Sequence, residues 1–245
     1  MRASHGHLHW WPASSPLEVC LGAILTQNTS WMNVERAIAN LKHAASIDPR
    51  QLLRLDRSKL AALLKPAGYF NVKTRRLRSF LSVLVTEFDA NLDGLFAGPT
   101  HQVRERLLAI HGIGPETADS MLLYAGGHLS FVIDAYTKRI FLRHAWCPAE
   151  ATYSDLQAVC VRSLSHTPRS ARLDYWQDYH AQLVMVGKEY CRRREPRCDR
   201  CPLRPLLPPP PALLHPSSAS ARSRRKWPAR RSAAGVGRTH ECIST

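Results

Sequence analysis

Residues 107–118 contain a pattern that could bind the phosphates of a polyanion. Apolar residues precede Gly112-Ile113-Gly114, and Glu116 and Thr117 follow. Glycines without a Cβ allow a backbone to approach a phosphate closely, and the free amides at a helix N-terminus can receive it. The segment predicts a helix, a tight hairpin and a second helix that anchor DNA independently of its sequence. A hairpin that only joins two helices is the alternative.

Asp134 is the second candidate. It lies twenty residues after Gly114, follows the apolar run 129–133 and precedes Lys138 and Arg139. A fixed carboxylate can stabilise positive charge that develops during a reaction. An Asp before a helix also commonly caps it. The two roles are compatible, and we predict that Asp134 is catalytic.

Together these patterns resemble the endonuclease III superfamily of DNA glycosylases over about residues 10 to 203. Gln27, in 24–29, resembles the glutamine of the first barrel helix that enters the DNA near the flipped nucleotide. Tyr69, in 68–73, resembles the loop that carries the family's wedge. The resemblance implies that Asp134 acts on duplex DNA containing a damaged base. It also implies DNA contacts by Gly112, Ile113, Gly114, Glu116, Thr117, Lys138 and Arg139.

Glu116 departs from part of the family. Bifunctional relatives have a lysine at this position, which forms a Schiff base with the sugar and then cleaves the strand. A carboxylate cannot form that imine. We therefore predict a monofunctional glycosylase that leaves the abasic site intact. A bifunctional oxidised-pyrimidine glycosylase/lyase and a noncatalytic DNA-binding protein are the alternatives.

Trp10 and Trp11 indicate the class of base. Within the superfamily, His9-Trp10-Trp11-Pro12 and the hairpin sequence are most similar to 3-methyladenine DNA glycosylase III and endonuclease III-related proteins. An alkylated purine is cationic, and stacking it on an indole face contributes about 0.5 to 2 kcal/mol. A neutral base gains less, so the pair is predicted to select alkylated purines. Packing of the two tryptophans between lobes is the alternative.

Cys191, Cys198 and Cys201 cluster near the end of the apolar part of the chain. Their spacing resembles the start of the superfamily's iron–sulfur loop, but Leu207 occupies the position expected for a fourth cysteine. The resemblance implies a 4Fe–4S cluster with an outside ligand or its structural relic, and zinc with His215 is a further possibility. The nearby arginines are suited to phosphate contacts.

Helix signals recur along the chain and position these residues. Ser15-Pro16-Leu17-Glu18, Asp48-Pro49-Arg50-Gln51 and 154–157 have the form of helix starts, followed by apolar residues at helical spacing. The run 129–133 is short enough to be either a strand or a buried connector. The predicted class is all-α.

The resemblance further implies two lobes with a DNA cleft between them. The expected organisation is a six-helix barrel at 17–130 and a discontinuous second lobe from 1–16 and 131–203. Residues 204–245, rich in Pro, Ser and Arg, are predicted to be a disordered basic tail. This tail either binds DNA nonspecifically or has no function.

The net charge of +15 favours a polyanionic partner, although the tail supplies about half of it. No apolar run approaches the roughly 18 residues that a membrane span needs. The N-terminus lacks the apolar core of a signal peptide. We expect a monomer located in the cytoplasm and associated with the nucleoid.

Overall fold

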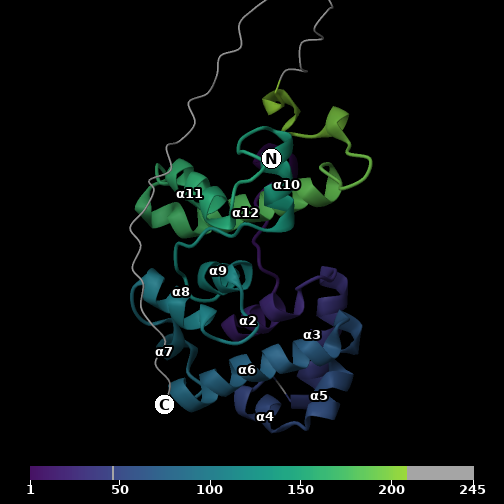
Figure 1. The fold of residues 1–245 in the computed structure, drawn as a ribbon, viewed down its shortest axis with the longest axis vertical. Helices are drawn as coiled ribbons and strands as arrows, with labels where there is room; N and C mark the ends of the chain where they lie inside the picture. The colour runs from purple at the N-terminus through teal and green to yellow at the C-terminus, as the bar shows by residue number, and fades with distance from the viewer. Residues whose placement is uncertain (46, 209–245) are drawn as a thin grey trace, which may run out of the picture. The chain divides into compact units, whose positions relative to one another are not determined.

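The computed structural model describes residues 1–45 and 47–208, and all regular structure within them is helical. The all-α prediction is confirmed. In order (Figure 1), the helices are α1 (Arg2–His5), α2 (Pro16–Leu25), α3 (Trp31–Ala45), α4 (Pro49–Arg54), α5 (Arg57–Leu63), η1 (Lys65–Ala67), α6 (Phe70–Phe88), α7 (Leu92–Phe96), α8 (Thr100–Leu108), α9 (Pro115–Tyr124), α10 (Ala135–Arg143), α11 (Tyr153–Leu164), η2 (Arg169–Ala171), α12 (Arg172–Glu189), η3 (Cys198–Arg200) and η4 (Arg204–Leu206).

Helices α2 to α9 enclose one hydrophobic core. Every residue of α2 from Leu17 to Leu25 is buried, so α2 is a central helix with almost no solvent-facing side. Phe80 of α6 and Leu122 of α9 pack in the same core. This core holds the hairpin between α8 and α9 in place.

Helices α10 to α12 form a second core around Phe131, Trp176 and Leu183. The run 129–133 reaches this core without forming a strand in the part of the chain that the structure describes. Of the two alternatives predicted for this run, a strand or a buried connector, the structure shows the buried connector. The predicted boundaries 17–130, 1–16 and 131–203 remain a prediction. The second core itself begins at Leu123.

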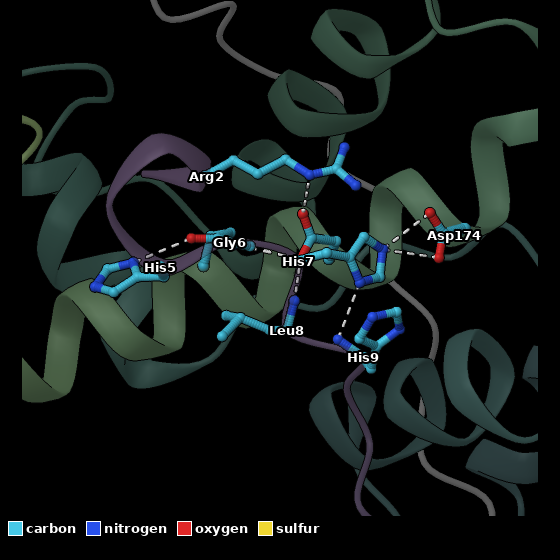
Figure 2. Close-up of polar contacts among 9 residues, drawn as sticks. Arg2, His5, Gly6, His7, Leu8, His9 and Asp174 are labelled. Atoms are coloured by element: carbon cyan, nitrogen blue, oxygen red, sulfur yellow. Dashed lines mark hydrogen bonds and ion pairs between the residues drawn. The ribbon is translucent and has the colours of Figure 1, made fainter.

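The N-terminal segment docks on α12 (Figure 2). The His7 imidazole lies 3.0 Å from a carboxylate oxygen of Asp174, and the Leu8 amide donates to Asp178 at 2.9 Å. Arg2 forms a 3.4 Å ion pair with Asp178. These contacts hold the chain immediately before Trp10 and Trp11 against the second core.

The helix-start signals hold with one correction. Ser15 and Asp48 accept backbone hydrogen bonds as N-caps of α2 and α4. The N-cap of α11, however, is Thr152, two residues before the predicted cap Ser154. Thr152 and Asp155 form a reciprocal capping box there, which satisfies the backbone amides of both residues and the hydroxyl of Thr152.

The tail prediction lies mostly outside the described residues. The structure describes only its first part, 204–208, which contains η4. Among the helices that are described, none combines the length and apolarity that crossing a bilayer requires.

Candidate active site and DNA interface

A cavity of about 610 Å3 contains the candidate catalytic residue. Its walls come from the N-terminal segment, the loop after α2, helix α9, the start of α10 and helix α12. Asp134, Glu116 and Trp10 line it, as do His180 and Lys188. Segments that are far apart in sequence thus converge on Asp134.

Asp134 is both the N-cap of α10 and a wall of the cavity. One carboxylate oxygen accepts from the Thr137 amide at 2.7 Å, and the other lies 3.8 Å from Nε2 of His180. The side chain is 12% exposed. The cap fixes one oxygen and leaves the other available to a ligand, so the two roles predicted for Asp134 coexist geometrically.

A buried hydrogen-bond network around Asp119 holds the connector that leads to Asp134. Asp119 is fully buried and accepts from Ser130 at 2.6 Å, Tyr153 at 2.8 Å and Gln157 at 2.9 Å. Arg104 donates to both Asp119 oxygens, at 2.8 and 3.1 Å. One carboxylate of α9 thereby joins α8, α11 and the connector, which fixes the direction in which the chain enters α10.

The predicted hairpin lies between α8 and α9, with Gly112 in a conformation that favours glycine. Its φ is +88°, and a Cβ there would lie 2.1 Å from Cγ of Arg76. Gly114 is exposed at the N-cap of α9, whereas Ile113 packs in the first core. Gly114 is therefore free to face a phosphate, and Ile113 anchors the loop.

Gln27 and Thr117 contact each other instead of lining the cavity. The Gln27 amide donates to Thr117 Oγ1 at 2.9 Å and to the Gly112 carbonyl at 3.2 Å. Arg76 donates to the Gln27 carbonyl oxygen. In this structure Gln27 supports the hairpin, and its predicted contact with the flipped nucleotide remains a prediction.

Glu116 lines the cavity and remains solvent-exposed on its outer side. Surrounding protein and the nearby negative charge of Asp134 raise the pKa of Glu116 to about 7. The position that carries a lysine in bifunctional relatives therefore holds a carboxyl group that changes charge near neutral pH.

Aromatic side chains form another wall of the cavity. The Trp11 ring lies 5.3 Å, centroid to centroid, from both Trp31 and Tyr124. Trp10 lies 6.4 Å from Trp31, and Lys188 Nζ lies 5.3 Å from the Trp10 ring. Trp31 was missed by sequence reasoning because no local motif surrounds it. Both tryptophans of the pair line the cavity and also pack against neighbours.

Tyr69 has the highest exposed fraction among the exposed large hydrophobic side chains of the described residues. It is 72% exposed and has a left-handed backbone, with φ +46°, immediately before α6. Buried Lys73 donates to the Ala67 carbonyl at 2.7 Å and fixes the preceding turn. Tyr69 does not line the cavity. Its exposure on an anchored turn is compatible with the predicted wedge.

The two basic residues after Asp134 have different surroundings, since Lys138 faces solvent and Arg139 contacts the protein. Lys138 is exposed. Arg139 donates to the Cys191 carbonyl at 2.7 Å and to the Gly187 carbonyl at 3.0 Å. Arg139 therefore ties α10 to the end of α12, a role that the sequence did not indicate.

The three clustered cysteines line one cavity of about 20 Å3, together with Leu207. Cys191 is buried and Cys198 is exposed. Within residues 1–45 and 47–208, no group of three or more potential ligands is placed to hold a metal ion. With an isobutyl group in place of a fourth thiolate, these residues do not fit a four-cysteine cluster. The zinc alternative named His215, which lies outside the described residues.

Arginines follow the cysteine loop on its surface. Arg192, Arg197 and Arg200 border a separate cavity of about 330 Å3 together with Tyr190. All three are exposed. Guanidinium groups on an open surface are suited to an anion such as a phosphate, whereas the Glu189 carboxylate that borders the same cavity would repel one.

Comparisons with known proteins support the resemblance. The profile of the HhH-GPD superfamily base excision DNA repair protein matches residues 21–165. A Methanocaldococcus jannaschii protein named as a DNA repair glycosylase is 42% identical over 205 residues, covering 82% of this chain and 89% of the relative.

Two solved structures are similar in fold. H. pylori 3-methyladenine DNA glycosylase, bound to 1,N6-ethenoadenine, is 29% identical with a TM-score of 0.65, covering 74% of this chain and 88% of that one. A non-covalent endonuclease III–DNA complex has a TM-score of 0.70 at 17% identity, covering 84% of this chain and 89% of that one.

Proposed function

Because the chain belongs to the HhH-GPD superfamily of base excision DNA repair proteins, we propose that it is a monofunctional DNA glycosylase for alkylated purines. The proposal rests on one observation: Asp134 and Glu116 line the same cavity. Glu116 occupies the position at which bifunctional relatives have the lysine that forms a Schiff base. The Helicobacter relative, which is named for 3-methyladenine, supports the class of base.

The chemistry follows from the charge of Asp134. Cleavage of an N-glycosidic bond builds positive charge on the deoxyribose as the base departs. A carboxylate held beside that sugar by the start of α10 stabilises this charge, and it needs no reorganisation because its cap fixes it in advance. Water then completes the hydrolysis, and the strand remains intact.

Release of 3-methyladenine from duplex DNA without strand cleavage is the expected result for the purified protein. Oligonucleotides that carry oxidised pyrimidine, uracil or mismatched adenine serve as the comparison substrates. Borohydride should trap no covalent adduct, because Glu116 cannot form an imine.

Lys188 provides the critical control, because it is the lysine among the cavity-lining residues. An adduct that forms with the parent and disappears in Lys188→Ala would contradict the monofunctional proposal. It would favour a lyase that uses α12 instead of α9.

Trp10 and Trp11 are expected to differ, with Trp10 contributing mainly to selection of the base and Trp11 mainly to stability. Trp10→Ala should lower kcat/KM for the cationic base by about 3- to 30-fold, since it removes a cation–π contact of about 0.5 to 2 kcal/mol. Single-turnover release of 3-methyladenine is compared with release of a neutral base. Equal losses on both substrates would assign Trp10 to packing.

Trp11→Ala should mainly lower stability, because Trp11 packs against Trp31 and Tyr124. Thermal unfolding of both variants separates this loss from a loss of recognition.

Glu116 predicts a pH dependence of DNA binding. With a pKa of about 7, Glu116 is mostly neutral below that pH and negative above it. Affinity for DNA should therefore fall as pH rises through 7, because the added charge repels phosphates. Fluorescence anisotropy between about pH 6 and pH 8 at constant ionic strength measures this change.

Glu116→Gln should remove the dependence, and Glu87→Gln, at an exposed site on α6, should retain it. In Asp134→Asn the transition should move to lower pH, because the charge that raises the Glu116 pKa is gone. If the pH dependence of DNA affinity were unchanged in Glu116→Gln, a titratable group other than Glu116 would be responsible for it.

A further inference from the structure

His180 of α12 is a buried imidazole whose two nitrogens have different surroundings. It is 4% exposed and lines the cavity. Nδ1 lies 2.6 Å from the Tyr124 hydroxyl oxygen. Nε2 is buried without a hydrogen-bond partner among the residues that the structure describes, and it lies 3.8 Å from an Asp134 oxygen.

The hydroxyl of Tyr124 determines which nitrogen carries the proton. Its single proton is donated to the Gln177 carbonyl at 3.0 Å. The phenolic oxygen therefore accepts from Nδ1–H of His180. In the neutral ring this leaves a lone pair on Nε2. An acceptor nitrogen and an acceptor carboxylate thus face each other across the cavity wall.

Nε2 of His180 and the Asp134 oxygen are both acceptors, so a molecule that binds between them must donate two protons. A distance of 3.8 Å is too long for a direct hydrogen bond. A water oxygen at about 2.8 Å from each atom can bridge it and donate to both.

We propose that Asp134 and His180 Nε2 bind one water molecule between them, that this water is the nucleophile, and that His180 is its general base. The proposal rests on the hydrolytic function proposed above. It adds a second catalytic residue, on a different helix from Asp134.

The step balances without any further reactant. The water oxygen forms a bond to C1′ of the deoxyribose, and the electron pair of the N-glycosidic bond leaves with the base. One water proton passes to Nε2 of His180. The resulting imidazolium lies beside the negative Asp134 and later releases its proton to solvent.

The surroundings of His180 keep its imidazole neutral, which is the form that can act as a general base. Burial lowers the pKa of His180, so the ring is neutral and able to accept a proton, while the Asp134 charge acts in the opposite direction. Tyr124 at the end of α9 contacts the ring. The other charged or titratable groups on the cavity wall are Glu116, Tyr136, Arg139 and Lys188.

Three variants test the proposal by single-turnover release of 3-methyladenine. His180→Asn retains a group near Nδ1 but removes Nε2, and it should slow release by about 10²-fold or more. His180→Gln returns an acceptor near Nε2 and should recover part of the rate. Tyr124→Phe frees the Nδ1 position, so the proton can move to Nε2, and it should also slow release.

His128→Asn is the matched control. Its two ring nitrogens contact Thr100 at 3.1 Å and the Phe96 carbonyl at 2.8 Å, so it loses structural contacts only. Its rate should equal that of the parent. DNA affinity should be unchanged in all variants. The acid limb of the pH–rate profile should be present in the parent and absent in His180→Gln.

The outcomes separate this proposal from the function itself. A folded His180→Asn protein with the parent's rate would overturn the role of His180 while leaving the glycosylase proposal intact. So would an acid limb that is unchanged in His180→Gln. A parent that is trapped by borohydride or releases no base would overturn the hydrolytic function, whatever the variants do.

Discussion

Asp134→Asn is expected to lower the single-turnover rate of base release by about 10²- to 10³-fold, and the variant should still bind DNA. Asparagine has the same size, and its carbonyl oxygen can still accept from the Thr137 amide, so the cap of α10 is retained. The negative charge that stabilises the developing cation is lost. Quenched-flow release of the base and fluorescence anisotropy measure the two quantities separately.

Asp48→Asn is the appropriate control, because Asp48 caps α4 through the Gln51 amide at 2.7 Å and does not line the cavity. Its rate should be unchanged. If both variants lost activity equally, the effect would arise from helix capping. If Asp134→Asn kept the parent's rate, the catalytic assignment would be wrong.

Asp119→Asn is expected to lower the free energy of unfolding by about 3 kcal/mol. The amide nitrogen of asparagine would face a guanidinium that now donates to both carboxylate oxygens. The substitution leaves Arg104, whose side chain is 27% exposed, without its charged partner, and it places an amide nitrogen among the donors that surround the fully buried position 119. Urea unfolding at neutral pH measures the loss.

Asp174→Asn is the control that tests whether loss of any ion pair lowers the free energy of unfolding by a similar amount. Asp174 pairs with His7 on the surface, with its side chain 66% exposed. Solvent screens such a pair, and its removal should cost less than about 1 kcal/mol. Similar losses in both variants would mean that the Asp119 network contributes little beyond an ordinary surface pair.

The sequence was sufficient for the superfamily, the enzyme class and the all-helical fold, all of which are confirmed. These predictions depended on local patterns. The hairpin, the Asp134 position and the helix caps each occupy a few neighbouring residues, so their spacing is visible in one dimension.

The remaining cavity wall depends on contacts between distant residues. His180 and Lys188 lie on α12, which has no motif around them, and Trp31 follows the loop after α2. Their approach to Asp134 results from packing of the two cores. Likewise, the partners of Gln27 and Arg139 are backbone and side-chain groups about 50 or more residues away.

Within residues 1–45 and 47–208, the chain joins its two cores through the segment before α2 and again through the end of α9 and the connector before α10. Both passages border the same cavity: Trp10 and Trp11 lie on the first, and Val132 and Asp134 on the second. Two covalent connections limit how far the cavity walls can separate, so under the proposed function we expect them to set an upper size for the base that is excised. Substitutions within either connection would shift this size threshold by steric exclusion, and selection by size can therefore evolve independently of selection by charge.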